Sequence, residues 1–148
     1  MFKAIIFLVF ITSIMASEES KHQPCKCTQE FSKTIFGNFS LSVESFKEHS
    51  LKGFVKSIEI KLKDKTIKIP KNVLDKIGFV KMNHWRVSTE SAWDGVNKIY
   101  LRTHSIEIQS EDKEETEVLI IVSRKGFEEL QLDGESIKFK SKEVEENP

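Results

Sequence analysis

A run of five apolar residues, from Val118 to Val122, constrains the fold of this chain more than any other stretch. The run is short and mostly β-branched, with Glu117 before it and Arg124-Lys125-Gly126 shortly after it, a pattern typical of a β-strand. A buried helical turn is the alternative. In a strand, Val118, Ile120 and Val122 face one way and the two residues between them face the other way. We therefore predict a central strand that other segments cover on both faces.

The N-terminus has the composition of a secretory signal. Lys3 supplies a positive charge, residues 4–15 are apolar, and Ala16 is a small residue where a cleavage site belongs. The apolar stretch is short for a membrane span, although an uncleaved anchor or a core helix is the alternative. We predict a signal peptide over 1–16 and a secreted product, either extracellular or periplasmic.

The charge balance gives no sign of a nucleic-acid partner. The chain has 23 Lys and Arg residues against 23 Asp and Glu residues, and this balance implies neither nucleic acid nor an anionic membrane. No second apolar segment is long enough to cross a bilayer. We expect no stable membrane insertion after signal cleavage.

Alternating apolar residues predict a series of antiparallel hairpins after residue 53. In the first, a two-residue turn at 64–65 would pair Leu62 with Ile67 and Ile60 with Ile69. A short helix over 71–77 should follow, because three apolar residues recur there at helical spacing before Gly78.

The next hairpin is predicted around an odd-length loop centred near Asp94. This register keeps one face apolar. It pairs Trp85 with Thr103, Val87 with Leu101, and Thr89 with Ile99. After Thr103 the apolar residues fall on even-numbered instead of odd-numbered positions, and a β-bulge at 104–105 would account for this switch.

The last predicted hairpin follows the central strand. A four-residue loop at 133–136 would pair Leu132 with Ile137 and Leu130 with Phe139.

The N-terminal part of the mature chain is rich in phenylalanine but irregular in spacing. Phe31 and Ile35 are four residues apart, and Ser42 could cap a second short helix. We predict that residues 28–52 cover the sheet as short helical segments, with additional strands as the alternative.

The predicted fold is mainly β with minor α, an antiparallel β-meander forming a small sandwich or an open barrel. We expect a flexible leader over 17–27, a single β-rich domain over 28–140 with its sheet over 53–140, and a disordered tail over 141–148.

The register of the 85–103 hairpin also predicts a small basic patch on its other face. There Arg86 would lie opposite Arg102 and His84 opposite His104, with Tyr100 beside them and Trp93 at the end. Like charges across a strand pair repel each other, and a bound carboxylate or phosphate would offset that repulsion. Neutralisation by Glu90 or by the acidic loop from Glu111 to Glu115 is the alternative.

The only two cysteines, with a nearby histidine, form a candidate metal site. His22, Cys25 and Cys27 carry soft ligands that suit Cu(I) or Zn, but no second ligand pair exists. A strained local disulfide, bonding to a partner chain or free thiols are the favoured alternatives, and we expect no cofactor.

Common catalytic and nucleotide-binding motifs are absent from the sequence. We therefore expect a binding protein, such as an inhibitor or accessory protein, whose partner is a protein or an anionic ligand. One alternative is a small hydrolase that combines His84 or His104 with a carboxylate such as Asp94. The other is a metal-binding protein that uses its cysteines.

Overall fold

The computed structural model describes residues 23–49, 52–81, 85–106 and 115–139. Within these ranges it has ten strands and one short helix. In chain order the elements are β1 (Gln23–Thr34), β2 (Gly37–His49), β3 (Lys52–Lys61), β4 (Thr66–Lys68), α1 (Lys71–Ile77), β5 (Phe79–Lys81), β6 (Arg86–Ser91), β7 (Asn97–Ile106), β8 (Glu115–Ser123), β9 (Gly126–Leu132) and β10 (Glu135–Ile137). The predicted signal peptide and C-terminal tail lie outside the described residues. No helix in the described ranges is long and apolar enough to cross a membrane.

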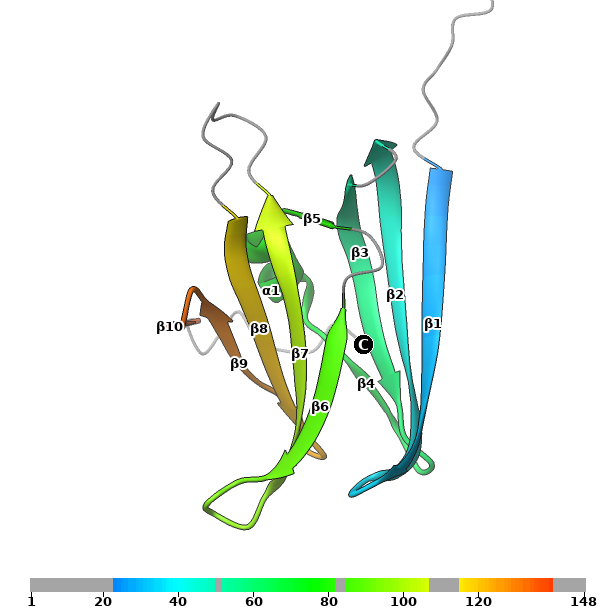
Figure 1. Cartoon of the computed structure of the whole chain (residues 1–148), viewed down its shortest axis with the longest axis vertical. Coiled ribbons are helices and arrows are strands. Elements are labelled where there is room, and N and C mark those ends of the chain that lie inside the picture. Colours follow the sequence, from blue (N-terminus) through cyan, green and yellow to red (C-terminus); the bar gives the residue numbers. More distant parts are fainter. Residues whose placement is uncertain (1–22, 50–51, 82–84, 107–114, 140–148) are drawn as a thin grey trace, which may run out of the picture.

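The strands form an antiparallel meander that folds into two layers. The hydrogen-bonded path runs β1-β2-β3-β5-β7-β8-β9-β10, with β4 beside β3 and β6 beside β7. A single pair, Val80 opposite Ser105, connects β5 to β7. Figure 1 shows β5 bridging the two layers near their upper end. Among the described strands the path ends at β1 and β10 without closing a barrel, which confirms the predicted mainly β meander with minor α.

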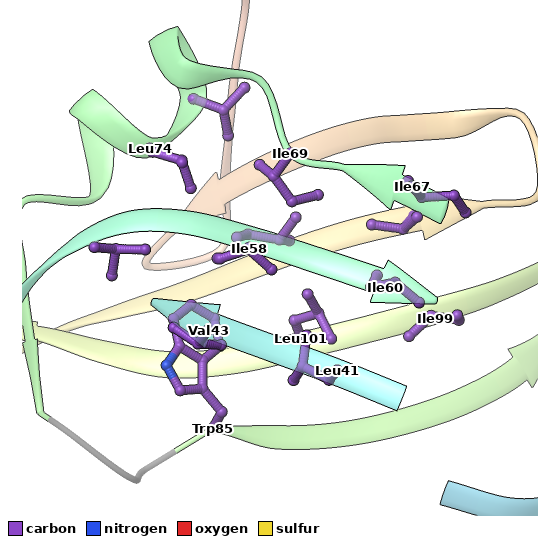
Figure 2. Close-up of a cluster of buried hydrophobic side chains, with 14 of the residues drawn as sticks. Leu41, Val43, Ile58, Ile60, Ile67, Ile69, Leu74, Trp85, Ile99 and Leu101 are labelled. Carbon is purple, nitrogen blue, oxygen red and sulfur yellow. The ribbon is translucent and has the colours of Figure 1, made fainter. Parts of the chain in front are cut away.

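The inner faces of the two layers share one hydrophobic core. Alternating residues of β2, β3, β7 and β8 point into it, and α1 adds Val73, Leu74 and Ile77. Figure 2 shows labelled side chains of β2, β3, β7 and α1 meeting in one cluster, with Ile58 and Ile60 from β3 among them. The predicted helix over 71–77 is therefore confirmed, and it ends at Gly78, whose φ of 68° suits glycine.

The apolar run at 118–122 is a strand at the centre of its layer, with β7 on one side and β9 on the other. Val118, Ile120 and Val122 are completely buried on the inner face. The outer face is covered differently from our prediction, because no second layer of the described chain lies over it. Instead, Ile121 is buried and Leu119 half-buried among the longer side chains of the flanking strands.

The N-terminal part of the chain corrects one prediction. Residues 28–49 contain no helix and form most of β1 and β2. Phe39 is buried and stacks on Phe31 of the neighbouring strand, with ring centroids 4.9 Å apart. Ile35 lies in the turn between the strands and is exposed, so its helical spacing from Phe31 had no structural meaning. The predicted flexible leader is also wrong for residues 23–27, which belong to β1.

The β3–β4 hairpin is shifted from its predicted register by two residues. Ile60 lies opposite Ile67, and the amide of Ile69 donates a hydrogen bond to the carbonyl of Ile58 at 3.0 Å. The loop therefore spans 62–65, because a two-residue turn needs positive φ angles that Asp-Lys disfavours. A shift by two preserves the side-chain parity, so the predicted apolar face is still the buried one.

The β9–β10 hairpin is tighter than predicted. Leu132 lies opposite Glu135, and Leu130 lies opposite Ile137. The turn consists of Asp133 and Gly134, whose φ angles of 49° and 80° are those of a type I′ turn. An Asp-Gly pair is a strong signal for this turn, and the predicted four-residue loop was therefore wrong.

The β6–β7 hairpin has the predicted register. Val87 lies opposite Leu101, Thr89 lies opposite Ile99, and residues 92–96 form the odd-length loop. The predicted bulge at 104–105 is wrong, since the pairing of β7 with β8 continues without a shift to Ile106. The inward position after Thr103 is filled by the buried side chain of Ser105 instead.

Thr103 offers a test of this packing. Its side chain is 1% exposed, and its Oγ1 has no hydrogen-bond partner among the described residues. A buried hydroxyl without a partner costs about 1–3 kcal/mol. We expect Thr103→Val to raise the free energy of unfolding by about 1 kcal/mol in urea denaturation. The same change at the exposed Thr66 should have an effect within about 0.5 kcal/mol, and a destabilised Thr103→Val protein would contradict the assignment.

Candidate functional site: the outer face of the β6–β7 hairpin

The register of β6 and β7 places two arginines directly opposite each other. Arg86 is the first residue of β6, and its partner on β7 is Arg102. Directly opposed residues of antiparallel strands have Cα atoms about 4.5–5.5 Å apart. Both side chains belong to the outer face, because Val87 and Leu101 occupy the inner face at the next position. The outer face of the hairpin thus concentrates two positive charges at one position.

Arg102 is held in place by two neighbours. Its Nη1 donates a hydrogen bond to Oγ of Ser88 at 3.0 Å, and its guanidinium lies 5.5 Å from the centre of the Tyr100 ring. Cation–π and hydrogen-bond contacts of this kind restrict the rotamers of a long side chain. Arg102 is half-buried, whereas Arg86 is exposed. One guanidinium is therefore fixed in advance, and the second is accessible beside it.

Among the described residues, carboxylates pair with three other cations but not with these two. Lys56 hydrogen-bonds Glu44 at 3.0 Å, which lowers the pKa of the Glu44 carboxyl. No ion pair within the described ranges includes Arg86 or Arg102. The ion pairs found there are Lys56–Glu44 at 3.0 Å, Lys68–Glu59 at 3.4 Å and Arg124–Asp64 at 3.3 Å.

The acidic residues predicted to neutralise the arginines do not lie directly opposite them in the described strands. Glu90 lies opposite Lys98. It is on the same face of the hairpin as Arg86 but four residues further along β6, so it is not beside the arginine pair. Residues 111–114 of the acidic loop lie outside the described residues, and Glu115 lies opposite Ile106, four residues along β7 from Arg102. On the outer face the carboxylate nearest in register is Glu117, diagonal to Arg102 across β7 and β8.

The other predicted contact residues are spread along the hairpin. His104 is exposed on the same face, two residues beyond Arg102, whereas His84 lies outside the described residues. Trp93 is fully exposed in the loop that follows β6. The last residue of β6, Ser91, is already about 16 Å from Arg86 at a rise of ~3.3 Å per residue. The arrangement brings together the two arginines and Tyr100, with His104 adjacent, and leaves Trp93 at the far tip.

The predicted hydrolase pair of His104 with Asp94 is not assembled, and the other predicted histidine, His84, lies outside the described residues. Asp94 lies in the β6–β7 loop, where its Oδ1 accepts a hydrogen bond from the amide of Val96 at 3.0 Å. His104 lies seven residues along β7 from Asn97, where that loop ends, or about 23 Å at the usual rise of a strand. Glu117 is opposite His104, but no hydrogen bond joins these two side chains.

The two cysteines lie on the edge strand β1. Cys25 and Cys27 are half-buried free thiols, opposite Ser45 and Val43 of β2. Two positions apart on a strand correspond to about 6.6 Å between Cα atoms, near the upper limit for a disulfide. Within the part of the chain that the structure describes, no group of three or more histidine, cysteine and acidic side chains could hold a metal ion. His22, the third predicted ligand, lies outside that part.

Comparison of the chain with protein-family models, with curated proteins and with solved structures finds no match.

Sequence reasoning missed a second surface feature, the gathering of the β1–β2, β3–β4, β6–β7 and β8–β9 turns at one end of the molecule (Figure 1). Arg124 of the β8–β9 turn forms an ion pair with Asp64 of the β3–β4 turn at 3.3 Å. The guanidinium of Arg124 also lies 5.8 Å from the ring centre of Phe36, in the β1–β2 turn. Each of these turns is visible in the sequence only as a local signal, so their proximity required the topology.

Proposed function

We propose that this chain is a small binding protein, secreted or periplasmic, that acts by contact with an acidic partner. The arginine pair on the outer face of the β6–β7 hairpin would form the contact surface. The observation that carries the proposal is that Arg86 and Arg102 face each other with no carboxylate partner among the described residues. The signal-like N-terminus motivates the location.

The physical basis is the repulsion between the two guanidinium groups. Like charges directly across an antiparallel pair destabilise it, and a carboxylate placed between them would remove that cost. Each guanidinium can donate two parallel hydrogen bonds to a carboxylate or a phosphate. Because Ser88 and Tyr100 already restrict Arg102, less side-chain freedom is lost when a partner binds.

A partner that is itself a protein suits the setting of this pair. Tyr100 adds a half-buried aromatic ring beside Arg102, and Leu119 lies opposite Arg102 on β8. Arginine and tyrosine are enriched among residues that carry binding energy in protein interfaces. An acidic side chain flanked by apolar groups would therefore match both the charge and the neighbouring apolar surface.

The separation of His104 from Asp94 leaves the hydrolase alternative without one of its two predicted acid–base pairs, and the other, with His84, lies outside the described residues. The free thiols on β1 likewise lack a third ligand among the described residues. Contact through the arginines is thus the function that the geometry supports best.

An affinity pull-down from the native extracellular or periplasmic fraction tests the proposal. Wild-type protein should retain an acidic partner that the Arg86→Ala/Arg102→Ala variant loses. The Lys26→Ala/Lys71→Ala variant is the matched control, because it removes the same charge from exposed positions on β1 and α1. Equal recovery on a folded double-arginine variant would exclude this face as the contact site.

A further inference from the structure

The four turns that gather at one end carry the exposed large apolar side chains of the described residues. Among the described residues only two large hydrophobic side chains are exposed, Ile35 at 46% and Trp93 at 107%. Ile35 lies in the β1–β2 turn, and Trp93 lies in the β6–β7 loop. Figure 1 shows both turns at the lower end, together with the β3–β4 and β8–β9 turns. We call this end the hairpin-tip surface and define it as residues 33–37, 62–65, 92–96 and 124–126.

The hairpin-tip surface is also more basic than the rest of the chain. It carries five cations and two carboxylates, although the whole chain has equal numbers of both. Its cations are Lys33, Lys63, Lys65, Arg124 and Lys125. The neutral overall composition therefore hides a local excess of positive charge.

Both carboxylates of the hairpin-tip surface have local roles. Asp64 pairs with Arg124 at 3.3 Å, and Asp94 accepts the amide hydrogen of Val96 at 3.0 Å. The Nζ of Lys65 donates to the carbonyl of Arg124 at 2.5 Å, which ties the β3–β4 and β8–β9 turns together. Lys63 and Lys125 are exposed, and their ammonium groups have no partner among the described residues. These two ammonium groups remain available for an external anion.

We propose that the hairpin-tip surface docks reversibly on a lipid bilayer that contains anionic headgroups. An indole favours the boundary between headgroups and acyl chains, where one edge is apolar and the other is wet. Lysine stems follow apolar surface while their charged ends reach the headgroups. Attachment that combines an apolar anchor with basic residues is stronger than either alone.

The shape of the hairpin-tip surface favours a bilayer over a folded protein partner. Ile35 and Trp93 are single exposed apolar side chains on two different turns, β1–β2 and β6–β7. A protein interface concentrates its binding energy in a packed central cluster. A fluid lipid surface can instead accept apolar side chains that lie on separate turns and insert to different depths.

Vesicle binding by the purified protein tests this proposal. Wild-type protein should partition more strongly onto phosphatidylcholine vesicles containing about one-third phosphatidylserine than onto phosphatidylcholine alone. Neutralising a lysine near the surface should weaken partition about fivefold, so Lys63→Gln/Lys125→Gln should lose about 25-fold. The control Lys26→Gln/Lys71→Gln removes the same charge away from the tips and should leave partition unchanged.

Tryptophan fluorescence gives a second readout. Vesicles should shift the emission of wild-type protein to shorter wavelength, and Trp93→Ala should abolish the shift, since Trp85 is already buried. The Arg86→Ala/Arg102→Ala variant should bind vesicles normally, which separates this surface from the proposed contact face. The proposal would be overturned if wild-type protein bound neither kind of vesicle. Equal partition of wild type and Lys63→Gln/Lys125→Gln would overturn it as well. Recovery of a soluble protein that depends on Trp93, without vesicle binding, would assign the surface to a protein instead.

Discussion

Replacing Ile120 with alanine should lower the free energy of unfolding by about 2–5 kcal/mol. Ile120 is completely buried on β8 and lies between Leu101 of β7 and Leu130 of β9, which are also completely buried. The variant removes several methyl and methylene groups from a site whose walls are hydrogen-bonded strands on both sides. Such walls cannot collapse easily into the cavity, so the loss of packing adds to the loss of apolar burial.

Equilibrium denaturation in urea measures this effect. The control is Lys138→Ala, at an exposed position beyond β10, where the change should be within about 0.5 kcal/mol. Equal shifts of the two midpoints would contradict the central position of β8.

Replacing Trp85 with alanine should cost about 3–5 kcal/mol. Trp85 precedes β6 and is 8% exposed, and it belongs to the same core cluster as Val43 of β2 and Leu101 of β7. Figure 2 shows its ring reaching into this cluster on the side where Val43 lies. The residue thus adds apolar area to a core that both layers share, and its loss should weaken the contact between them.

The second tryptophan provides the control for this experiment. Trp93→Ala removes the same number of atoms at a fully exposed position, and we expect an effect within about 0.5 kcal/mol. Comparable destabilisation by the two substitutions would show that Trp85 does not pack in the core.

The sequence predicted the parts of the fold in which apolar alternation and loop length agree. The β6–β7 register followed from keeping Val87 and Leu101 on one face, and this choice alone placed Arg86 opposite Arg102. The helix over 71–77 was equally readable, because apolar spacing and Gly78 indicated the same boundaries. Consistent local signals of this kind make an element predictable.

Prediction failed where a local spacing fitted two structures. The interval between Phe31 and Ile35 suits a helix, but pairing with β2 determines the conformation of this segment, and pairing is not a local property. The bulge predicted at 104–105 assumed that every inward position is apolar, whereas Ser105 is buried there. The hairpin-tip surface depends on contacts between residues 60 positions apart, such as Arg124 and Asp64, which no local pattern encodes.

The affinity of the recovered acidic partner for wild-type protein and for Arg86→Ala/Arg102→Ala is the most direct test of the proposed contact surface. A hydrogen bond to a charged group contributes about 1.5–3 kcal/mol, so the double variant should bind at least about tenfold more weakly. Raising the salt concentration should weaken the wild-type complex, because exposed charges are screened beyond about 10 Å at 0.1 M salt. The Lys26→Ala/Lys71→Ala control should keep the wild-type affinity. An unchanged dissociation constant for a folded Arg86→Ala/Arg102→Ala protein would contradict the account.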